Sequence, residues 1–275
     1  MLTALPIRTC GAWFRGSTLH VLGTNKPRIV ETAVRPGNEG TMHTIVLATQ
    51  KGGTGKSTLA IGLAVAAMQA GHVVRMIDTD RQRTVANWRR RRAKAEPAVE
   101  AVTVAGDVER RLHVFDRSGV TLTVIDTAAG VSPLTTTAIQ AADLCLIPAR
   151  PSPIDIEATA PTLSMIRAFD RPFAFILNQT PSRSQRIDDA ATSLGHEATA
   201  LDLAGLVAQP YVTLRNDHQD AFGKGLGVTE YAPAGRSAEE VRGLWQWVDR
   251  RLLLLAPELA MGARPDRAVN LLPAA

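Results

Sequence analysis

The sequence contains little cysteine and no long hydrophobic run. Cys10 and Cys145 are the two cysteines among 275 residues, and they form neither a CxxC motif nor a Cys/His cluster. This excludes a disulfide framework and leaves no cysteine set for zinc or an iron–sulfur cluster, so a reducing cytoplasm fits best. No stretch approaches the roughly 18 apolar residues that span a bilayer, and the N-terminus lacks the apolar core and cleavage site of a signal peptide. We therefore expect a soluble protein with no membrane partner.

The composition indicates one ordinary globular domain with extensions. Hydrophobic residues make up 45% of the chain, and the formal net charge of +5 permits contact with nucleic acid without requiring it. Residues 1–41 carry eight glycines and prolines without a sustained periodicity. This predicts either a disordered extension or a misassigned start, with translation beginning at Met42. We expect the folded domain at 42–258 and a flexible tail at 259–275.

Strand-like and helix-like segments alternate from Met42 onward. A strand is predicted near 44–48, a helix near 57–69 that ends at Gly71, and a second strand near 73–77. Further strands are predicted near 99–102, 121–125, 144–148, 173–177 and 205–208. Apolar residues at helical spacing predict a last helix that packs on the sheet: Val241, Leu244, Trp245, Val248 and Leu252. The alternation predicts an α/β fold with a mostly parallel twisted sheet and helices on both faces.

A glycine-rich segment between the first strand and the first helix carries the clearest chemistry. It reads Gln50-Lys51-Gly52-Gly53-Thr54-Gly55-Lys56-Ser57-Thr58. In such a segment, backbone N–H groups surround phosphate oxygens at the N-terminus of a helix. Lys56 is expected to reach the β and γ phosphates, Ser57 to offer its hydroxyl to Mg²⁺, and Thr58 to lie at the α-phosphate. The segment therefore predicts a P-loop NTPase.

Carboxylates follow two apolar strands that should end at the same sheet edge. Asp78 and Asp80 end the segment VVRMIDTD, and Asp126 ends LTVID. Ligands of parallel sheets bind at this edge. An isolated aspartate after a strand is ordinarily a turn or cap residue. Beside a P-loop, we interpret Asp126 as holding the Mg²⁺ shell through water, together with Asp80, which is also expected to help position the attacking water. Asp78 is expected to support them.

The P-loop departs from the usual pattern, because Gln50 stands where a glycine is common and Lys51 adds a second lysine. In this form, KGGTGKST resembles the deviant Walker A motif of the ParA/MinD family of P-loop ATPases. It is most similar to the small plasmid- and chromosome-partitioning ParA proteins that lack a helix-turn-helix domain. The resemblance implies that Lys51 crosses a dimer interface to the partner's phosphates, so that ATP and Mg²⁺ join two subunits. It also implies catalytic roles for Lys51, Lys56, Asp80 and Asp126, and nucleotide contacts from Gly52, Gly53, Thr54, Gly55, Lys56, Ser57, Thr58 and Asn178.

Three further segments extend the resemblance over about residues 43–250. IPARPSPID, which ends at Asp155, is similar to the P-x-x-PS-x-x-D segment of plasmid ParA proteins, and FILNQT holds Asn178 at the family's purine-contacting position. The family's C-terminal pattern is matched by Arg215, Ala221, Gly225, Val228 and Glu230. The chain departs from the family at residues 80–82 and 126–130, which read DRQ and DTAAG where DPQ and DTPP or DTPAG are usual. These departures bear on the rate of hydrolysis.

The resemblance implies an ATPase that acts in plasmid or chromosome partitioning. It implies a homodimer that holds nonspecific DNA at the nucleoid in the ATP state, and release by hydrolysis that a ParB-like adaptor stimulates. DNA would be held through its phosphates, with these candidate residues: Arg183, Arg186, Arg215, Lys224, Arg242, Arg250 and Arg251. The run Arg89–Arg92 either touches DNA or a partner, or simply solvates its helix.

A ParA-like scaffold that positions a conjugation complex or another non-DNA cargo is the alternative, and the core motif does not separate the two. Other roles in the family are disfavoured. The Gly/Pro-interrupted residues 1–41 supply no helix-turn-helix, and the proline-broken C-terminus supplies no basic amphipathic helix for a membrane. A cluster of the nitrogenase iron-protein kind would need paired cysteines.

Overall fold

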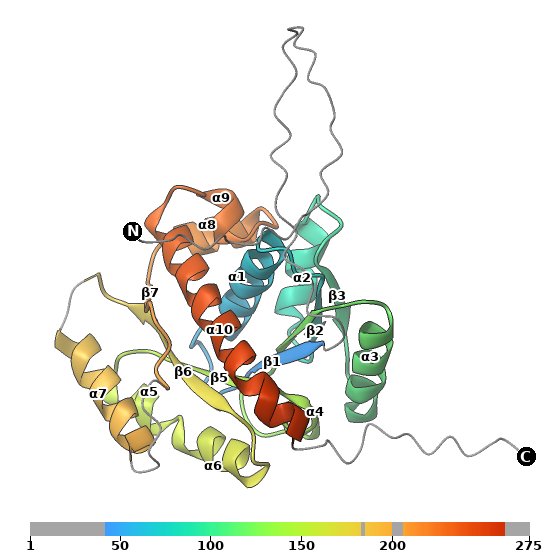
Figure 1. Ribbon diagram of the computed structural model, residues 1–275. Coiled ribbons are helices and arrows are strands. Elements are labelled where there is room, and N and C mark those ends of the chain that lie inside the picture. The colour runs from blue at the N-terminus through green and yellow to red at the C-terminus, as the bar shows by residue number, and fades with distance from the viewer. Residues whose placement is uncertain (1–41, 183–184, 200–205, 262–275) are drawn as a thin grey trace, which may run out of the picture. The chain divides into compact units, whose positions relative to one another are not determined.

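The computed structural model describes residues 42–182, 185–199 and 206–261. The predicted extension at 1–41 lies outside these residues, as does the predicted tail from residue 262 onward. The described chain forms a seven-stranded parallel sheet in the order β3-β2-β4-β1-β5-β6-β7 (Figure 1). The strands are β1 (His43–Leu47), β2 (Val74–Asp78), β3 (Ala98–Ala101), β4 (Leu122–Asp126), β5 (Leu144–Ala149), β6 (Phe173–Thr180) and β7 (Val212–Thr213). The predicted P-loop NTPase fold is confirmed.

Helices cover both faces of the sheet. One face is covered by α1 (Lys56–Gln69), α2 (Thr84–Arg91), α8 (Asp217–Gly223), α9 (Val228–Tyr231) and α10 (Arg236–Met261). The other is covered by α3 (Ala105–Arg117), α4 (Pro133–Ala141), α6 (Ala160–Ala168) and α7 (Gln185–Thr199), and the short α5 (Pro153–Glu157) follows β5. Successive strand residues alternate between the two cores, as Ile45 and Val46 do, because parallel strands are buried on both sides. None of the described helices is long and apolar enough to cross a membrane.

The strand register brings three strand ends together. β1 is central, and its last residue, Leu47, pairs with Asp126 at the end of β4 and with Leu146 in β5. Asp78, at the end of β2, also pairs with Asp126. The loops after β1, β2 and β4 therefore leave the sheet side by side, at the edge where ligands of parallel sheets bind.

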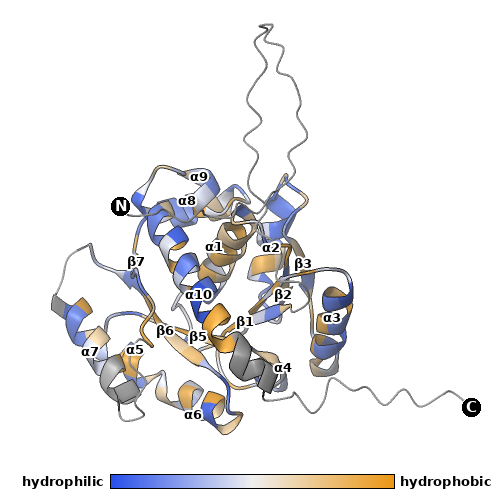
Figure 2. Ribbon diagram, in the orientation of Figure 1, coloured by the Kyte–Doolittle hydropathy of each residue, from blue (hydrophilic) through white to orange (hydrophobic). Residues whose placement is uncertain are grey.

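The long C-terminal helix α10 packs on α1. A Cβ on Gly62 would lie 3.3 Å from Cγ1 of Val241, so a glycine at this position lets the two helices approach closely. The residues of the predicted apolar stripe on α10 are all buried in the core beside α1, which confirms the prediction. Figure 2 shows that α1 is largely apolar, whereas α10 carries polar residues in its first half.

One predicted strand is wrong in its described part. Near 205–208, Val207 forms only an isolated bridge with Phe175. Pro210 follows closely and has no N–H to give to a sheet, and the chain pairs with β6 again only at Val212–Thr213. The helix predicted at 57–69 is confirmed as α1, and Gly71 adopts a φ of 99° just after it, as residues that end helices often do.

Candidate nucleotide-binding site

The glycine-rich segment turns from β1 into α1 through two left-handed residues. Gly53 and Gly55 have φ angles of 78° and 86°, which L side chains rarely adopt. A Cβ on Gly55 would also lie 2.3 Å from Nδ2 of Asn178, so any side chain there would collide with β6. Gly55 directly precedes Lys56, the first residue of α1, so the unpaired N–H groups of the first helical turn face the loop. This is the backbone geometry of an anion site.

Lys56 lies beneath this loop and is only 7% exposed. Its Nζ donates to the carbonyl oxygens of Thr49 and Lys51 at 3.5 and 3.4 Å, which are long bonds to uncharged acceptors. Burial lowers the pKa of Lys56, and the negative charges of Asp126 and Asp80 oppose this only in part. A phosphate beside this ammonium would gain a charge-assisted hydrogen bond that is stronger than those two contacts.

Ser57 and Asp126 are joined directly. Ser57 Oγ donates to Asp126 Oδ2 at 2.6 Å. Asp126 is fully buried, and burial raises its pKa to about 7 although the hydrogen bond from Ser57 acts against the rise. Its other oxygen, Oδ1, is buried without a hydrogen bond from any described residue. An orphaned carboxylate oxygen beside a hydroxyl fits the water shell of Mg²⁺, so the residues present suit the predicted ion.

The two aspartates after β2 differ in their contacts. Asp78 accepts the backbone N–H groups of Asp80 and Ala86 at 3.0 and 2.9 Å, and burial raises its pKa. It fixes the loop to the first turn of α2, which is a supporting role. Asp80 accepts the N–H of Gln82 at 2.9 Å and is partly exposed. Its negative charge acts on Lys56 across the loop, and its contact with the nucleotide stays a prediction.

Two side chains of strand β6 hydrogen-bond to the backbone of the P-loop. Asn178 Nδ2 donates to the carbonyl oxygen of Thr54 at 2.7 Å, and Gln179 Nε2 donates to that of Gly53 at 3.1 Å. Asn178 is 4% exposed. Its amide is therefore committed to the loop backbone, and the purine contact expected of it stays a prediction.

Lys51, at the start of the P-loop, is held by the segment after β5. Its Nζ lies 3.2 Å from Asp155 Oδ1. Arg150 Nε binds the same oxygen at 3.1 Å, and Ser152 Oγ donates to the other oxygen. Burial alone would raise the pKa of Asp155, but the hydrogen bonds from Ser152, Arg150 and Lys51 bring it below its ordinary value. The sequence analysis missed this pairing, although Ser152 and Asp155 have the spacing of a helix cap and its third-position acid.

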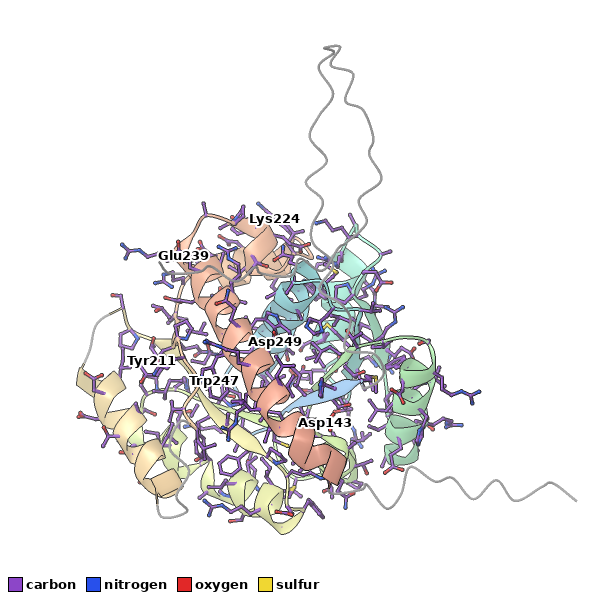
Figure 3. All side chains as sticks on the ribbon, in the orientation of Figure 1. Asp143, Tyr211, Lys224, Glu239, Trp247 and Asp249 are labelled. Atoms are coloured by element: carbon purple, nitrogen blue, oxygen red, sulfur yellow. The ribbon has the colours of Figure 1, made fainter. Side chains whose placement is uncertain are left out.

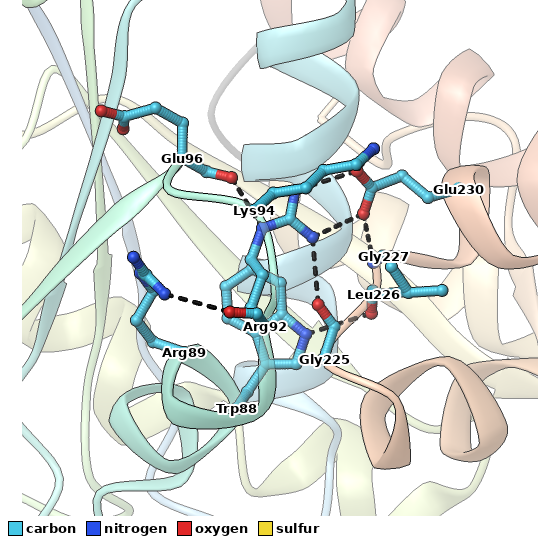
Figure 4. Close-up of polar contacts among 9 residues, drawn as sticks. All are labelled: Trp88, Arg89, Arg92, Lys94, Glu96, Gly225, Leu226, Gly227 and Glu230. Carbon is cyan, nitrogen blue, oxygen red and sulfur yellow. Dashed lines mark hydrogen bonds and ion pairs between the residues drawn. The ribbon is translucent and has the colours of Figure 1, made fainter.

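A buried polar network ties α2 to the segment that holds α8 and α9 (Figure 4). The Arg92 side chain is 0% exposed and binds both carboxylate oxygens of Glu230, at 2.6 and 2.9 Å. Lys94 also binds Glu230, at 2.9 Å, and Trp88 Nε1 donates to the carbonyl oxygen of Leu226 at 3.1 Å. The view that the whole run Arg89–Arg92 faces solvent or a partner is therefore wrong for Arg92, whose charge is neutralised inside the protein.

Glu230→Gln is expected to destabilise the protein by about 3 kcal/mol or more at neutral pH, because it leaves a buried guanidinium without a counter-charge. Burial would raise the pKa of Glu230, but Arg92, Lys94 and the N–H of Gly227 bring it to about 2. Because the pKa of Glu230 is lower in the folded protein than in the unfolded chain, its ionised form stabilises the fold fully above pH 4.5. This stabilisation is lost as pH falls toward 2.

Urea unfolding at pH 7 and near pH 3.5 checks this prediction, and the difference between wild type and Glu230→Gln should shrink at the lower pH. Glu239→Gln, which alters an exposed carboxylate on α10, is the matched control and should change little. An equal loss of stability at both pH values would contradict the ion pair.

The predicted DNA-contacting cations do not share one face. Arg186 lies on α7, across the sheet from α8 and α10, and Arg183 lies outside the described residues. Arg215 is half-buried and binds Glu240 at 2.7 Å. Lys224 is exposed at the end of α8 (Figure 3). The remaining candidates lie along α10: Arg242, Arg250 and Arg251. Their roles stay predictions.

Several known proteins match part or most of this chain. A family model described as VirC1 protein matches residues 42–187. Protein ParA of Rhizobium radiobacter is 33% identical over 142 residues, which is 48% of this chain and 62% of that protein. Protein virC1 of the same organism is 29% identical over 126 residues, which is 44% of this chain and 54% of that protein. The match thus spans less than two thirds of either relative.

A longer match is found with the maintenance of carboxysome distribution protein A of Halothiobacillus neapolitanus, 26% identical over 72% of this chain and 91% of that protein. Solved structures share the fold. An ATP complex of McdA from Cyanothece has a TM-score of 0.63 at 17% identity, over 78% of this chain and 97% of that one. Pyrococcus horikoshii MinD with Mg-ADP has a TM-score of 0.61 at 15% identity, over 78% and 99%.

Proposed function

Because the chain belongs to the VirC1 protein family, within the ParA/MinD-type P-loop ATPases, we propose that it is an ATP-dependent dimerising ATPase that acts in plasmid or chromosome partitioning. The observation that carries this proposal is one juxtaposition at the carboxyl edge of the sheet. The buried ammonium of Lys56 lies under an anion-binding turn, and the Ser57–Asp126 pair lies beside it. A cation, a hydroxyl and a buried carboxylate in this order suit a polyphosphate and its Mg²⁺.

Each residue has a separate part in hydrolysis. Bound Mg–ATP supplies the electrophilic phosphorus. Lys56 neutralises the β and γ phosphates, and the loop N–H groups orient them. Ser57 and Asp126 hold the ion's ligand shell, and Asp80 orients the attacking water.

Dimerisation depends on Lys51. The contact between its ammonium and Asp155 is partly exposed, so the side chain is free to exchange that carboxylate for a γ-phosphate of a second subunit. Loss of this phosphate on hydrolysis removes the attraction between the subunits. The ATP dimer holds nonspecific DNA at the nucleoid of the cytoplasm, and a ParB-like adaptor speeds its release.

A second candidate is favoured by one of the relatives. A relative matched over 72% of this chain is named for carboxysome distribution rather than for partition. The same dimer switch would then position a conjugation complex or another non-DNA cargo, and no DNA surface would be needed.

Two measurements made in parallel separate these candidates. One is equilibrium binding to random-sequence duplex DNA without nucleotide, with ADP and with ATP–Mg²⁺. The other is the molar mass of the protein under the same conditions. The partition function predicts a DNA-bound dimer in ATP only, with affinity that falls steeply as salt rises. An ATP-dependent dimer that ignores DNA would support the cargo scaffold. A protein that neither binds ATP nor changes its mass with ATP would contradict both.

A further inference from the structure

Helix α2 and the loops on either side of it carry the positive excess of the chain. Between Arg81 and Ala95 the sequence has six arginines, one lysine and no acidic residue, which exceeds the formal net charge of +5 for all 275 residues. This segment begins directly after Asp80, at the nucleotide edge of the sheet. The rest of the protein is close to neutral, so an anionic macromolecule would meet its strongest attraction here.

The buried side of α2 decides which arginines face outward. Trp88 and Arg92 lie about one turn apart and point inward, where they bind the segment that holds α8 and α9. Arg90 lies between them in sequence and therefore points away, and it is exposed. Arg91 is also exposed, with its guanidinium 4.5 Å above the ring of Phe222. The exposed cations, here called the α2 basic face, are Arg81, Arg83, Arg90, Arg91, Lys94 and Lys224.

Neighbouring acids do not cancel this charge. Glu230 is shared by two cations, Arg92 and Lys94, so one negative charge meets two positive ones. Glu96 is bound by Arg75 of β2 at 2.7 Å. Asp217 and Asp220 lie on α8 before Lys224, and Asp80 precedes Arg81. These three acids are fewer than the exposed cations of the face. The face therefore keeps a net positive charge after every pair in this region is counted.

We propose that the α2 basic face binds the phosphate backbone of duplex DNA. Among the described residues, no exposed large apolar side chain belongs to α2, α8 or α9. The face thus offers no apolar anchor for a bilayer and no apolar centre for a protein interface. Arginine forks suit phosphate oxygens, and such contacts carry no sequence information. The proposal rests on the proposed partition function and assigns the surface that it requires.

The same face is linked to the nucleotide site. Asp78 accepts the N–H of Ala86 in the first turn of α2 and pairs in register with Asp126. The loop that leads into α2 holds Asp80. A change in this loop when nucleotide binds would therefore move Arg90 and Arg91, so DNA affinity should follow the nucleotide state.

The test compares wild type with R90A/R91A in equilibrium binding to random duplex DNA of about 60 base pairs with ATP–Mg²⁺, over a series of salt concentrations. Loss of two phosphate contacts should reduce the slope of log affinity against log salt by about 2 and weaken binding about tenfold at moderate salt. The matched control R110A/R117A removes the same charge from exposed positions on α3. The control should bind DNA as wild type does.

Two further readouts keep the outcomes distinct. Both variants should form the ATP dimer at the wild-type nucleotide concentration, which shows that the fold and the switch are intact. If wild type binds DNA and R90A/R91A binds it equally well, the α2 assignment is overturned and the proposed function stands. If wild type binds no DNA in any nucleotide state, the proposed function fails and this surface fails with it. If R90A/R91A loses binding to phosphatidylglycerol vesicles but keeps wild-type DNA binding, the face binds lipid and the proposal is overturned.

Discussion

Lys56→Met is expected to remove most of the stabilisation of the protein by ATP–Mg²⁺ while leaving the nucleotide-free fold intact. In the structure, the Lys56 ammonium is buried and holds only long bonds to two carbonyl oxygens among the described residues. Methionine keeps the apolar stem and removes a charge whose burial lowers its pKa. The melting temperature without nucleotide should therefore stay the same or rise. The charge-assisted hydrogen bond to phosphate, worth about 3 kcal/mol, is lost, so affinity should fall about 100-fold.

Thermal unfolding over a series of ATP–Mg²⁺ concentrations checks this, because a ligand that binds only the folded state raises its melting temperature. Lys51→Ala is the matched control, since it removes the other lysine of the same loop and should keep the ATP-dependent rise. A rise in Lys56→Met equal to that of wild type would show that the phosphates bind elsewhere.

The fold was accessible from the sequence because its signals are local. Short apolar runs that alternate with helical segments predict a parallel sheet, and both cores depend on that alternation. The strand expected near 205–208 failed for a reason that apolarity alone does not show. Pro210 interrupts the ladder there, and pairing with β6 resumes only at Val212.

The sequence likewise identified some residues of the candidate site and missed the partners of others. Gly55, Lys56 and Ser57 were identified because they are contiguous, and Asp126 because it ends a strand next to β1. The partners of Lys51 and Arg92 were not identified. Arg92 and Glu230 are 138 residues apart, and the composition around Arg92 resembles a solvated basic run. Only the folded contacts of Arg92 with Gly225 and Glu230 make that arginine structural, while Arg90 and Arg91 stay exposed.

Lys51→Ala is expected to keep ATP binding and to lose ATP-dependent dimerisation. The Lys51 ammonium lies 3.2 Å from Asp155. Among the described residues, it makes no contact that would shape the phosphate-binding turn. Asp155 keeps Arg150 and Ser152 as partners when Lys51 leaves, so the release of Lys51 leaves no buried carboxylate unpaired. The lysine can therefore exchange one carboxylate for a phosphate of the other subunit at little cost, and its removal should act on association alone.

Asp155→Asn tests the other side of this exchange. It removes the negative charge that holds Lys51 but keeps a side chain of the same shape at the start of α5. Asp155 is buried, but the Lys51 end of the pair is 27% exposed and screened by water, so the pair contributes less than about 1 kcal/mol and the ATP concentration for half-maximal dimerisation should fall by about threefold. Sedimentation velocity over an ATP series measures both variants, with wild type as reference. Wild-type ATP-dependent association by Lys51→Ala would refute the role in trans. If Asp155 only competes with the phosphate for Lys51, its removal cannot raise the ATP requirement above that of wild type. A higher requirement in Asp155→Asn would therefore show that Asp155 positions Lys51 for the partner subunit.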